Sequence, residues 1–349
     1  MTTATPHRHW FKLFKKTAWL VGVGAVLAWS VWLLYSKLLA EVSTDPAAKA
    51  LIDAGGLWTD ITVIVRSISG SLAQVSLKAY LLAGFSAMAA YVALAWYDRI
   101  ALIYLRREKE ISWLYIAVCS FVTYALGHNL GASVFSGGLV RLRAYTAKGL
   151  TATEVAILVT LCSFTFAYGT LILTGFVFVV EPEIVQPLAE VIPVLALPPT
   201  LVRTIGFALL LLCALYVLGS WLHFKPVHWR ALHIVYPRLP IVGRQLLAAP
   251  LEIIAAAGII HFALPEAGHP GFLIVLGAFV LSFSAGLLSQ TPGGIGVMEA
   301  VFLALMSTVS PSDVVAALLI WRLMYLLIPL ALSLPVVMAF ERSQLRRSH

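Results

Sequence analysis

The segment Leu288-Ser289-Gln290-Thr291-Pro292-Gly293-Gly294-Ile295-Gly296-Val297-Met298-Glu299 interrupts one of the most apolar parts of the chain with a proline, three glycines and a carboxylate. Hydrocarbon tolerates irregular backbone only where protein buries it or where it lines a cavity. Thr291 can cap a new helix with Pro292 at its first position, and open N–H groups at a helix start attract anions such as phosphate. The segment therefore indicates either a tight turn between packed helices or an anion site at membrane depth.

The composition predicts a membrane protein. Of the 349 residues, 60% are hydrophobic and 11% are charged. Apolar runs of about 20 residues recur along the chain, which is typical of transmembrane helices. We therefore expect one all-α polytopic domain over residues 1–349, in the cytoplasmic (inner) membrane. The net charge of +8 comes from Lys and Arg at segment ends, so we expect no nucleic acid as a partner. The three cysteines show no metal-ligand spacing, and we expect neither a metal nor a cofactor.

Eight full transmembrane helices are expected, the first being an uncleaved helix rather than a signal peptide. They lie at about 18–39, 76–97, 112–128, 152–180, 200–222, 246–264, 271–290 and 313–340. The polar stretch 41–74 can hold a short surface helix. Cytoplasmic loops collect Lys and Arg, so both termini, 98–110 and 223–245 are expected inside and 181–199 outside. The loops obey this rule if each of two glycine-rich segments changes sides as a short or broken helix; re-entrant insertion stays open.

The glycine-rich pattern occurs twice. Ser136-Gly137-Gly138-Leu139 aligns with Pro292-Gly293-Gly294-Ile295, and Arg143 then aligns with Glu299. A capped start of a long helix follows each segment, at 151–154 and at 310–313. We predict an inverted-topology repeat with halves at about 112–180 and 271–340, since broken helices in matching positions mark substrate sites in transporters. Chance recurrence of glycines and caps is the alternative.

These two motifs resemble the membrane half of bacterial lysyl-phosphatidylglycerol synthases, the multiple peptide resistance factors, over about residues 15–340. The resemblance implies a lipid flippase. Met298 departs from the pattern, because relatives often have a basic residue there. The sequence ends at His349 without the soluble aminoacyl-transferase half, so we expect no lysyl transfer. The first motif is matched by Asn129, Gly137, Gly138 and Arg141, and the second by Pro292, Gly293, Gly294, Gly296 and Glu299.

Ionisable residues at membrane depth are candidates for a specific role, because placing each charged side chain there costs about 2.5–3.5 kcal/mol of free energy. Glu299 and Arg322 lie at similar distances from an expected turn near 310–312. We predict that they form an ion pair at the floor of a central cavity, or a structural pin between two helices. Glu252 is interpreted either as a proton or head-group partner or as a locally paired residue.

Polar residues of the first motif also have two interpretations. Arg141, Arg143 and Lys148 either receive a lipid phosphate or anchor the chain at the cytoplasmic surface. His128 and Asn129 either contact a head group or satisfy backbone groups freed by a helix break.

The expected function is movement of a phosphate-bearing lipid, aminoacylated or polyprenyl-linked lipids included, between leaflets, without enzymatic activity. The alternatives are a membrane scaffold or regulator of a lipid-modifying synthase, and an intramembrane enzyme acting on a lipid head group. Besides the lipid, such a synthase and a second copy of the chain are candidate partners. The expected substrate-binding residues are Asn129, Gly137, Gly138, Arg141, Arg143, Pro292, Gly293, Gly294, Gly296, Glu299 and Arg322.

Overall fold

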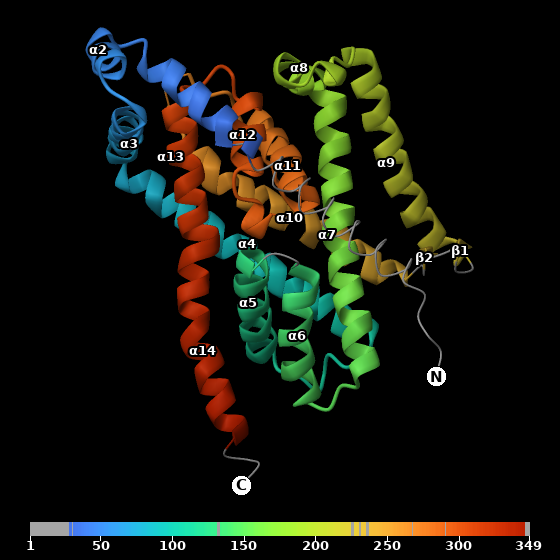
Figure 1. Ribbon diagram of the computed structural model, residues 1–349. Helices are drawn as coiled ribbons and strands as arrows, with labels where there is room; N and C mark the ends of the chain where they lie inside the picture. Colours follow the sequence, from blue (N-terminus) through green and yellow to red (C-terminus); the bar gives the residue numbers. More distant parts are fainter. Residues whose placement is uncertain are drawn as a thin grey trace, which may run out of the picture.

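The computed structural model describes residues 28–345 apart from 30, 131–132, 225–226, 230–231, 235–236, 267 and 290. Helices dominate this part of the chain (Figure 1), and the strand pairing within it is the short antiparallel hairpin of β1 (Val227–Trp229) and β2 (Leu232–Ile234). Six described helices are long and apolar enough to cross a membrane. They are α4 (Leu77–Tyr104), α7 (Ala152–Val180), α9 (Pro199–Trp221), α10 (Leu239–Ala263), α11 (Phe272–Ser289) and the composite helix Pro311–Phe340. The expected all-α membrane protein is confirmed.

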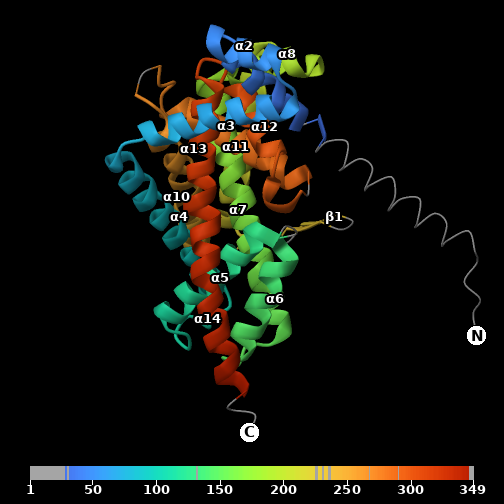
Figure 2. The ribbon, with the colours of Figure 1, turned by 60° about the vertical axis from the view of Figure 1, so that its left-hand side comes forward.

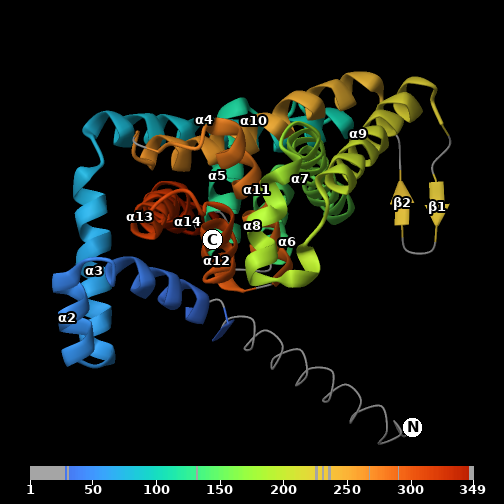
Figure 3. The same ribbon diagram turned by 90° about the horizontal axis from the view of Figure 1, so that it is seen from above.

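The composite helix has an internal irregularity. It consists of α13 (Pro311–Trp321), the π-helical turn η4 (Arg322–Leu327) and the first part of α14 (Ile328–Leu345). Figure 3 shows α13 and α14 end-on beside α5, α11 and α12. A π-turn inside an α-helix frequently marks a functional site.

Six of the eight expected helices match these spans. Of the expected helix at 18–39, residues 18–27 and 30 lie outside the described part, and residues 31–42 are helical. The expected helix at 112–128 is α5 (Trp113–Leu130), which is not among the six and ends with the polar pair His128 and Asn129.

Two helix ends were predicted wrongly. Helix α4 continues to Tyr104, through part of the expected charged turn, and α10 begins at Leu239, inside the expected basic loop. The physical reason is pairing inside the bundle. Asp98 is fully buried against Arg141, and Gln245 is fully buried between Thr165 and Tyr216. A polar residue whose hydrogen bonds are satisfied in the interior does not end a helix.

Surface helices cover one end of the molecule. The polar stretch 41–74 holds two helices, α2 (Pro46–Ala54) and α3 (Leu57–Gln74), rather than one. They lie at the same end as α8 (Gln186–Val191), which follows η1 (Pro182–Val185) and precedes η2 (Pro193–Leu195). The C-terminal end of α14 lies at the opposite end (Figures 1 and 2).

Two helical hairpins enter the molecule from these opposite ends. Helices α5 and α6 (Ser133–Thr146) lie side by side in the half that contains the end of α14. Helix α11, the turn η3 (Pro292–Gly294) and α12 (Val297–Leu305) form the second hairpin, in the half that contains α8 (Figures 1 and 2). A long helix follows each hairpin. This is the arrangement that an inverted repeat predicts, and the boundaries of its halves stay a prediction.

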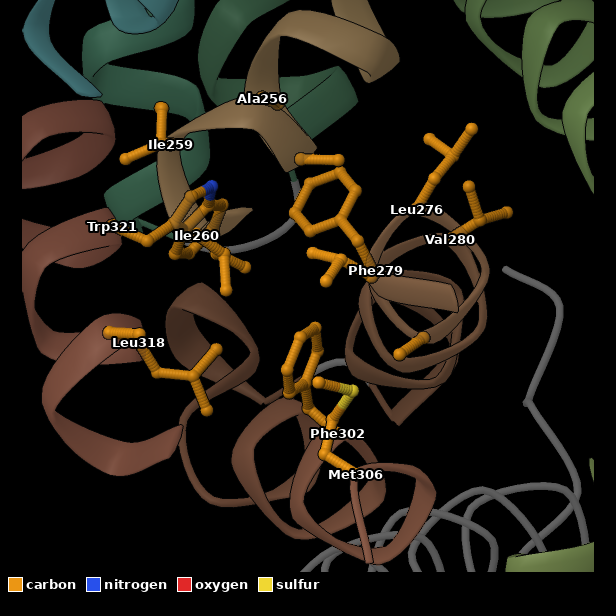
Figure 4. Packing of buried hydrophobic residues seen from close by; sticks show 14 of the residues in the cluster. Ala256, Ile259, Ile260, Leu276, Phe279, Val280, Phe302, Met306, Leu318 and Trp321 are labelled. Atoms are coloured by element: carbon orange, nitrogen blue, oxygen red, sulfur yellow. The ribbon is translucent and has the colours of Figure 1, made fainter. Parts of the chain in front are cut away.

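The core joins both hairpins to the long helices. Helices α4 and α10 pack closely through small residues, among them Ala83, Ala90, Ala256 and Ala257, which are fully buried. Aromatic side chains from α11, α12 and α13 converge in the same cluster (Figure 4). The Phe279 and Trp321 ring centroids, for example, lie 5.7 Å apart.

Candidate functional site

The hairpins meet at their tips. Gly293 has φ 60° and Gly296 has φ 82°, backbone conformations that favour glycine. A Cβ atom on Gly293 would lie 3.6 Å from the backbone oxygen of His128, at the end of α5, and one on Gly294 would lie 3.3 Å from Cα of Gly286 on α11. The glycines therefore turn the chain and also let η3 lie directly against α5 and α11.

The predicted ion pair between Glu299 and Arg322 is present at this junction. Glu299 Oε1 accepts from Arg322 Nε and also lies in ion-pair contact with Nη2. Glu299 Oε2 accepts a hydrogen bond of 2.8 Å from the N–H of Gly296, and Arg322 Nη1 donates one of 3.2 Å to the oxygen of Gly293. The pair thus ties α12 to the π-turn η4 and holds both ends of the glycine loop. Its role in substrate binding stays a prediction.

A second ion pair lies deeper in the bundle. Asp98 on α4 is fully buried and Arg141 on α6 is 4% exposed, with 2.5 Å between Oδ1 and Nη2. Tyr145 donates 2.8 Å to Asp98 Oδ2, Cys162 Sγ donates 3.4 Å to Oδ1, and the guanidinium lies 4.8 Å from the ring centroid of Tyr124.

Arg141 was expected either to receive a lipid phosphate or to anchor the chain at the cytoplasmic surface. The structure pairs it with Asp98, and its role in substrate binding stays a prediction. Sequence analysis missed Asp98 because it assigned this residue to a charged turn. The apolar run 100–105 that follows Asp98 was the available signal, since it continues the helix past the two charges.

A third polar cluster surrounds η4. Glu252 on α10 is 3% exposed and accepts a 2.5 Å hydrogen bond from the hydroxyl of Tyr325. The His128 ring stacks on the Tyr325 ring, with 5.3 Å between centroids. Asn129 Nδ2 donates to the backbone oxygen of Leu326 at 3.1 Å, and the Tyr91 hydroxyl donates to that of Tyr325 at 3.0 Å. The backbone oxygens of Tyr325 and Leu326 in the π-turn are therefore satisfied by side chains. The role of Asn129 in substrate binding stays a prediction.

The remaining expected residues have diverse surroundings. A Cβ on Gly137 would lie 3.0 Å from Cγ2 of Thr123, so this glycine allows α6 to pack closely on α5, whereas the nearest atom to one on Gly138 is 4.0 Å away. Pro292 begins η3. Arg143 is exposed and lines an apolar groove.

Two apolar grooves flank α5. The first has a volume of about 850 Å³ and lies between α4, α5 and α14, and the second has about 240 Å³ and lies between α5, α6 and α14. Val118 and Val336 line both grooves, so the two are adjacent. Tyr91 belongs to the first groove and Arg143 to the second, whereas Glu299 and Arg322 line neither.

The arrangement brings charged and hydrogen-bonding groups together deep inside apolar helices. It offers two internally compensated ion pairs and one buried carboxyl group next to a tyrosine hydroxyl. It also offers two apolar grooves, the first of which is lined by Tyr91 of the third polar cluster. Among the described residues, no group of three or more His, Cys, Asp or Glu side chains has the geometry for a metal ion. Such a set of groups is suited to binding a charged group and an apolar chain at the same time.

Two known proteins are similar to the chain, whereas no protein-family model matches it. Over 263 residues the chain is 31% identical to the uncharacterized protein slr0712 of Synechocystis, a match that covers 74% of this chain and 78% of slr0712. Over 255 residues it is 28% identical to the inner membrane protein YbhN of Escherichia coli, covering 72% of this chain and 76% of YbhN. Each match spans most of both proteins and so concerns the domain rather than one motif. Neither relative is named as a lysyl-phosphatidylglycerol synthase, and that resemblance stays a prediction.

Proposed function

The chain belongs to the same protein family as slr0712, and we propose that it moves a phosphate-bearing lipid between the two leaflets of a membrane. The observation that carries this proposal is the meeting of two oppositely directed hairpins at a polar junction within apolar helices. The proposed translocation involves no covalent step. The resemblance of both glycine motifs to the membrane half of lysyl-phosphatidylglycerol synthases supports the same function.

The central position of η4 in its membrane span supports the proposal. Tyr325 lies 14 residues after Pro311 and 15 residues before Phe340, so η4 is central in its span, about 21 Å from either end at 1.5 Å per residue. Unprotected irregular backbone is not tolerated at such depth. We propose that both hairpins are re-entrant and that their tips form a midplane site, as broken helices do in transporters with inverted repeats.

The chemistry of a lipid fits the groups around this site. Arginine binds phosphate oxygens through paired donors, and Arg322 lies against the glycine loop, where its Nη1 atom donates to the backbone oxygen of Gly293. The grooves beside α5 have apolar walls that suit acyl or prenyl chains. Arg143 lines the second groove, and we propose that it meets a phosphate entering from the cytoplasmic side, where the positive-inside rule predicts both termini.

Reconstitution tests the proposal. Purified protein is placed in liposomes that carry a trace of fluorescent phosphatidylglycerol, lysyl-phosphatidylglycerol or phosphatidylcholine, and access of each lipid to an impermeant quencher is followed. We expect the protein to accelerate movement of at least one phosphate-bearing lipid, and Arg322→Gln to slow it at least tenfold. Arg66→Gln, an exposed charge change on α3, is the matched control and should stay within twofold of wild type.

One result would contradict the proposed lipid movement. If folded wild-type protein accelerates none of these lipids, nor a polyprenyl phosphate, translocation is wrong and the scaffold function takes its place. Co-purification with a lipid-modifying synthase would then be the next observation to seek.

A further inference from the structure

Glu252 differs from the other carboxyl groups of the interior. Asp98 is paired with Arg141, and Glu299 is paired with Arg322. Glu252 has no ion-pair partner among the described residues, although it is 3% exposed and lies 13 residues from Leu239 at one end of α10. Its Oε1 atom accepts from the Tyr325 hydroxyl, and its buried Oε2 atom has no hydrogen-bond partner.

The elements packed around Glu252 supply tyrosines rather than cations. Helix α4 presents Tyr91 and Tyr97, whose hydroxyls donate to the backbone oxygens of Tyr325 and Ala249. The turn η4 presents Tyr325 itself.

The remaining neighbours of α10 bring no cation to this carboxyl group. Helix α11 has no titratable residue, and α13 has only Asp313, in its first turn. On α7, Cys162 bonds to Asp98 and Tyr168 to a backbone oxygen of α9, while Tyr216 on α9 bonds to Gln245.

A proton is the ligand that completes this site. A buried carboxylate without a cation is strongly disfavoured, whereas the neutral acid is not. A proton on Oε2 removes the uncompensated negative charge and leaves Oε1 free to accept from Tyr325. The neighbouring His128 ring also has a buried Nδ1 atom without a partner, so a second group able to exchange a proton lies against Tyr325.

We propose that Glu252 is a proton-binding site and that its protonation and deprotonation drive movement of the two hairpins against each other at their junction. The carboxylate takes one proton from water to become the neutral acid and returns that proton to water in the other state. The mechanical connection is η4, because Tyr325, the partner of Glu252, is three residues from Arg322, the partner of Glu299. This inference rests on the proposed function and names its energy source, a proton gradient.

Two measurements on the full-length protein test the inference. The first is movement of the fluorescent lipid in liposomes with and without an imposed pH gradient. We expect the gradient to change the wild-type rate at least fivefold, and Glu252→Gln, which imitates the neutral acid, to move lipid at a rate that the gradient changes by less than 1.5-fold. Glu190→Gln, an exposed carboxyl change on α8, is the matched control and should keep the wild-type dependence.

The second measurement does not depend on transport. Infrared difference spectra of wild type against Glu252→Gln should show a carboxylic-acid band that disappears as the pH is raised, and Tyr325→Phe should shift this band. Glu252→Asp should restore the gradient dependence, which a purely structural role would not require. Tyr325→Phe replaces Glu252→Gln as the test variant if the latter does not fold.

The outcomes distinguish the proton site at Glu252 from the proposed lipid movement. An unchanged gradient dependence in Glu252→Gln, or the absence of a band from residue 252, overturns the proton site while lipid movement still stands. If wild type moves no lipid, the proposed function fails, and the infrared band alone then decides: its titration supports the proton site and its absence overturns it.

Discussion

Charged residues inside the bundle are satisfied in different ways, and this decides what each can do. Arg141 is enclosed by Asp98 and the Tyr124 ring, so it holds α6 to α4. Arg322 binds both the carboxylate of Glu299 and the backbone of the glycine loop, so the proposed phosphate ligand would compete with the fold for the same donors. The first pair is suited to stability and the second to a response.

The Glu299–Arg322 pair should reveal itself in a double-mutant comparison. Because a lone charge left in an apolar interior is costly, Glu299→Gln and Arg322→Gln should each lower the melting temperature in detergent more than the double variant does. Thermal unfolding followed by circular dichroism measures this. A double variant that is less stable than both single variants would contradict the pairing, and three variants with wild-type stability and transport would remove the pair from the account.

The Asp98–Arg141 pair should be structural. Arg141→Gln leaves a fully buried carboxylate without its cation, and we expect a loss of about 3–5 kcal/mol in the free energy of unfolding. The protein that does fold should move lipid at the wild-type rate per molecule. A loss of transport at unchanged stability would instead mean that Arg141 binds the lipid.

At the residue scale, the sequence predicts ion-pair and hydrogen-bond partners only where the number of residues between them and a shared turn determines their positions. Glu299 and Arg322 lie on consecutive helices, at similar distances from the turn that joins them, so their pairing follows from the helical rise. Asp98 and Arg141 lie on helices separated by α5, and nothing local relates their positions. Tyr325 and Glu252 are 73 residues apart, which made that contact equally inaccessible.

At the scale of elements, the glycine turn η3 has two roles: it reverses the direction of the chain, and it lets the chain pack closely against neighbouring helices. Gly293 and Gly294 have positive φ angles, and Gly294 also lies against Gly286. The turn η4 adds a second irregularity that faces the first through Arg322. Two breaks in regular hydrogen bonding thus meet at one place.

Alanine substitutions should distinguish a required conformation from a mere absence of side chain. Gly293→Ala places a Cβ at φ 60° and should cost about 1–2 kcal/mol in unfolding free energy, together with lipid movement. Gly138→Ala has open space and an ordinary φ angle, so it should be neutral or slightly stabilising. Melting temperatures and transport rates of both variants provide the check, and equal behaviour of the two would count against the strained turn.

Element types were more predictable than element ends. Long apolar runs identified the six candidate spans because their composition alone excludes water-exposed helices. The ends of α4 and α10 were missed because polar residues were read as surface residues, although Asp98 and Gln245 are satisfied inside. The π-turn left no local signal, because Arg322–Leu327 has the composition of an ordinary helix.

For the whole molecule, the two hairpins make one unit from elements of opposite direction. The α5–α6 hairpin and the α11–α12 hairpin are rooted at opposite ends (Figure 1), and their tips meet where the glycine turn lies against His128. Asn129 joins the first hairpin to η4 of the composite helix. The repeated glycine pattern predicted opposite directions, whereas the meeting of the tips depends on tertiary packing that no single motif encodes.

Sided cysteine labelling in intact cells tests most directly whether the hairpins are rooted on opposite faces of the membrane. Lys148→Cys marks the base of the first hairpin and Ser307→Cys that of the second, and both positions are exposed, while the three natural cysteines are buried. With an impermeant thiol reagent, we predict that residue 307 is labelled in intact cells and that residue 148 is labelled only after the membrane is permeabilised. Labelling of both positions from the same side would contradict the account.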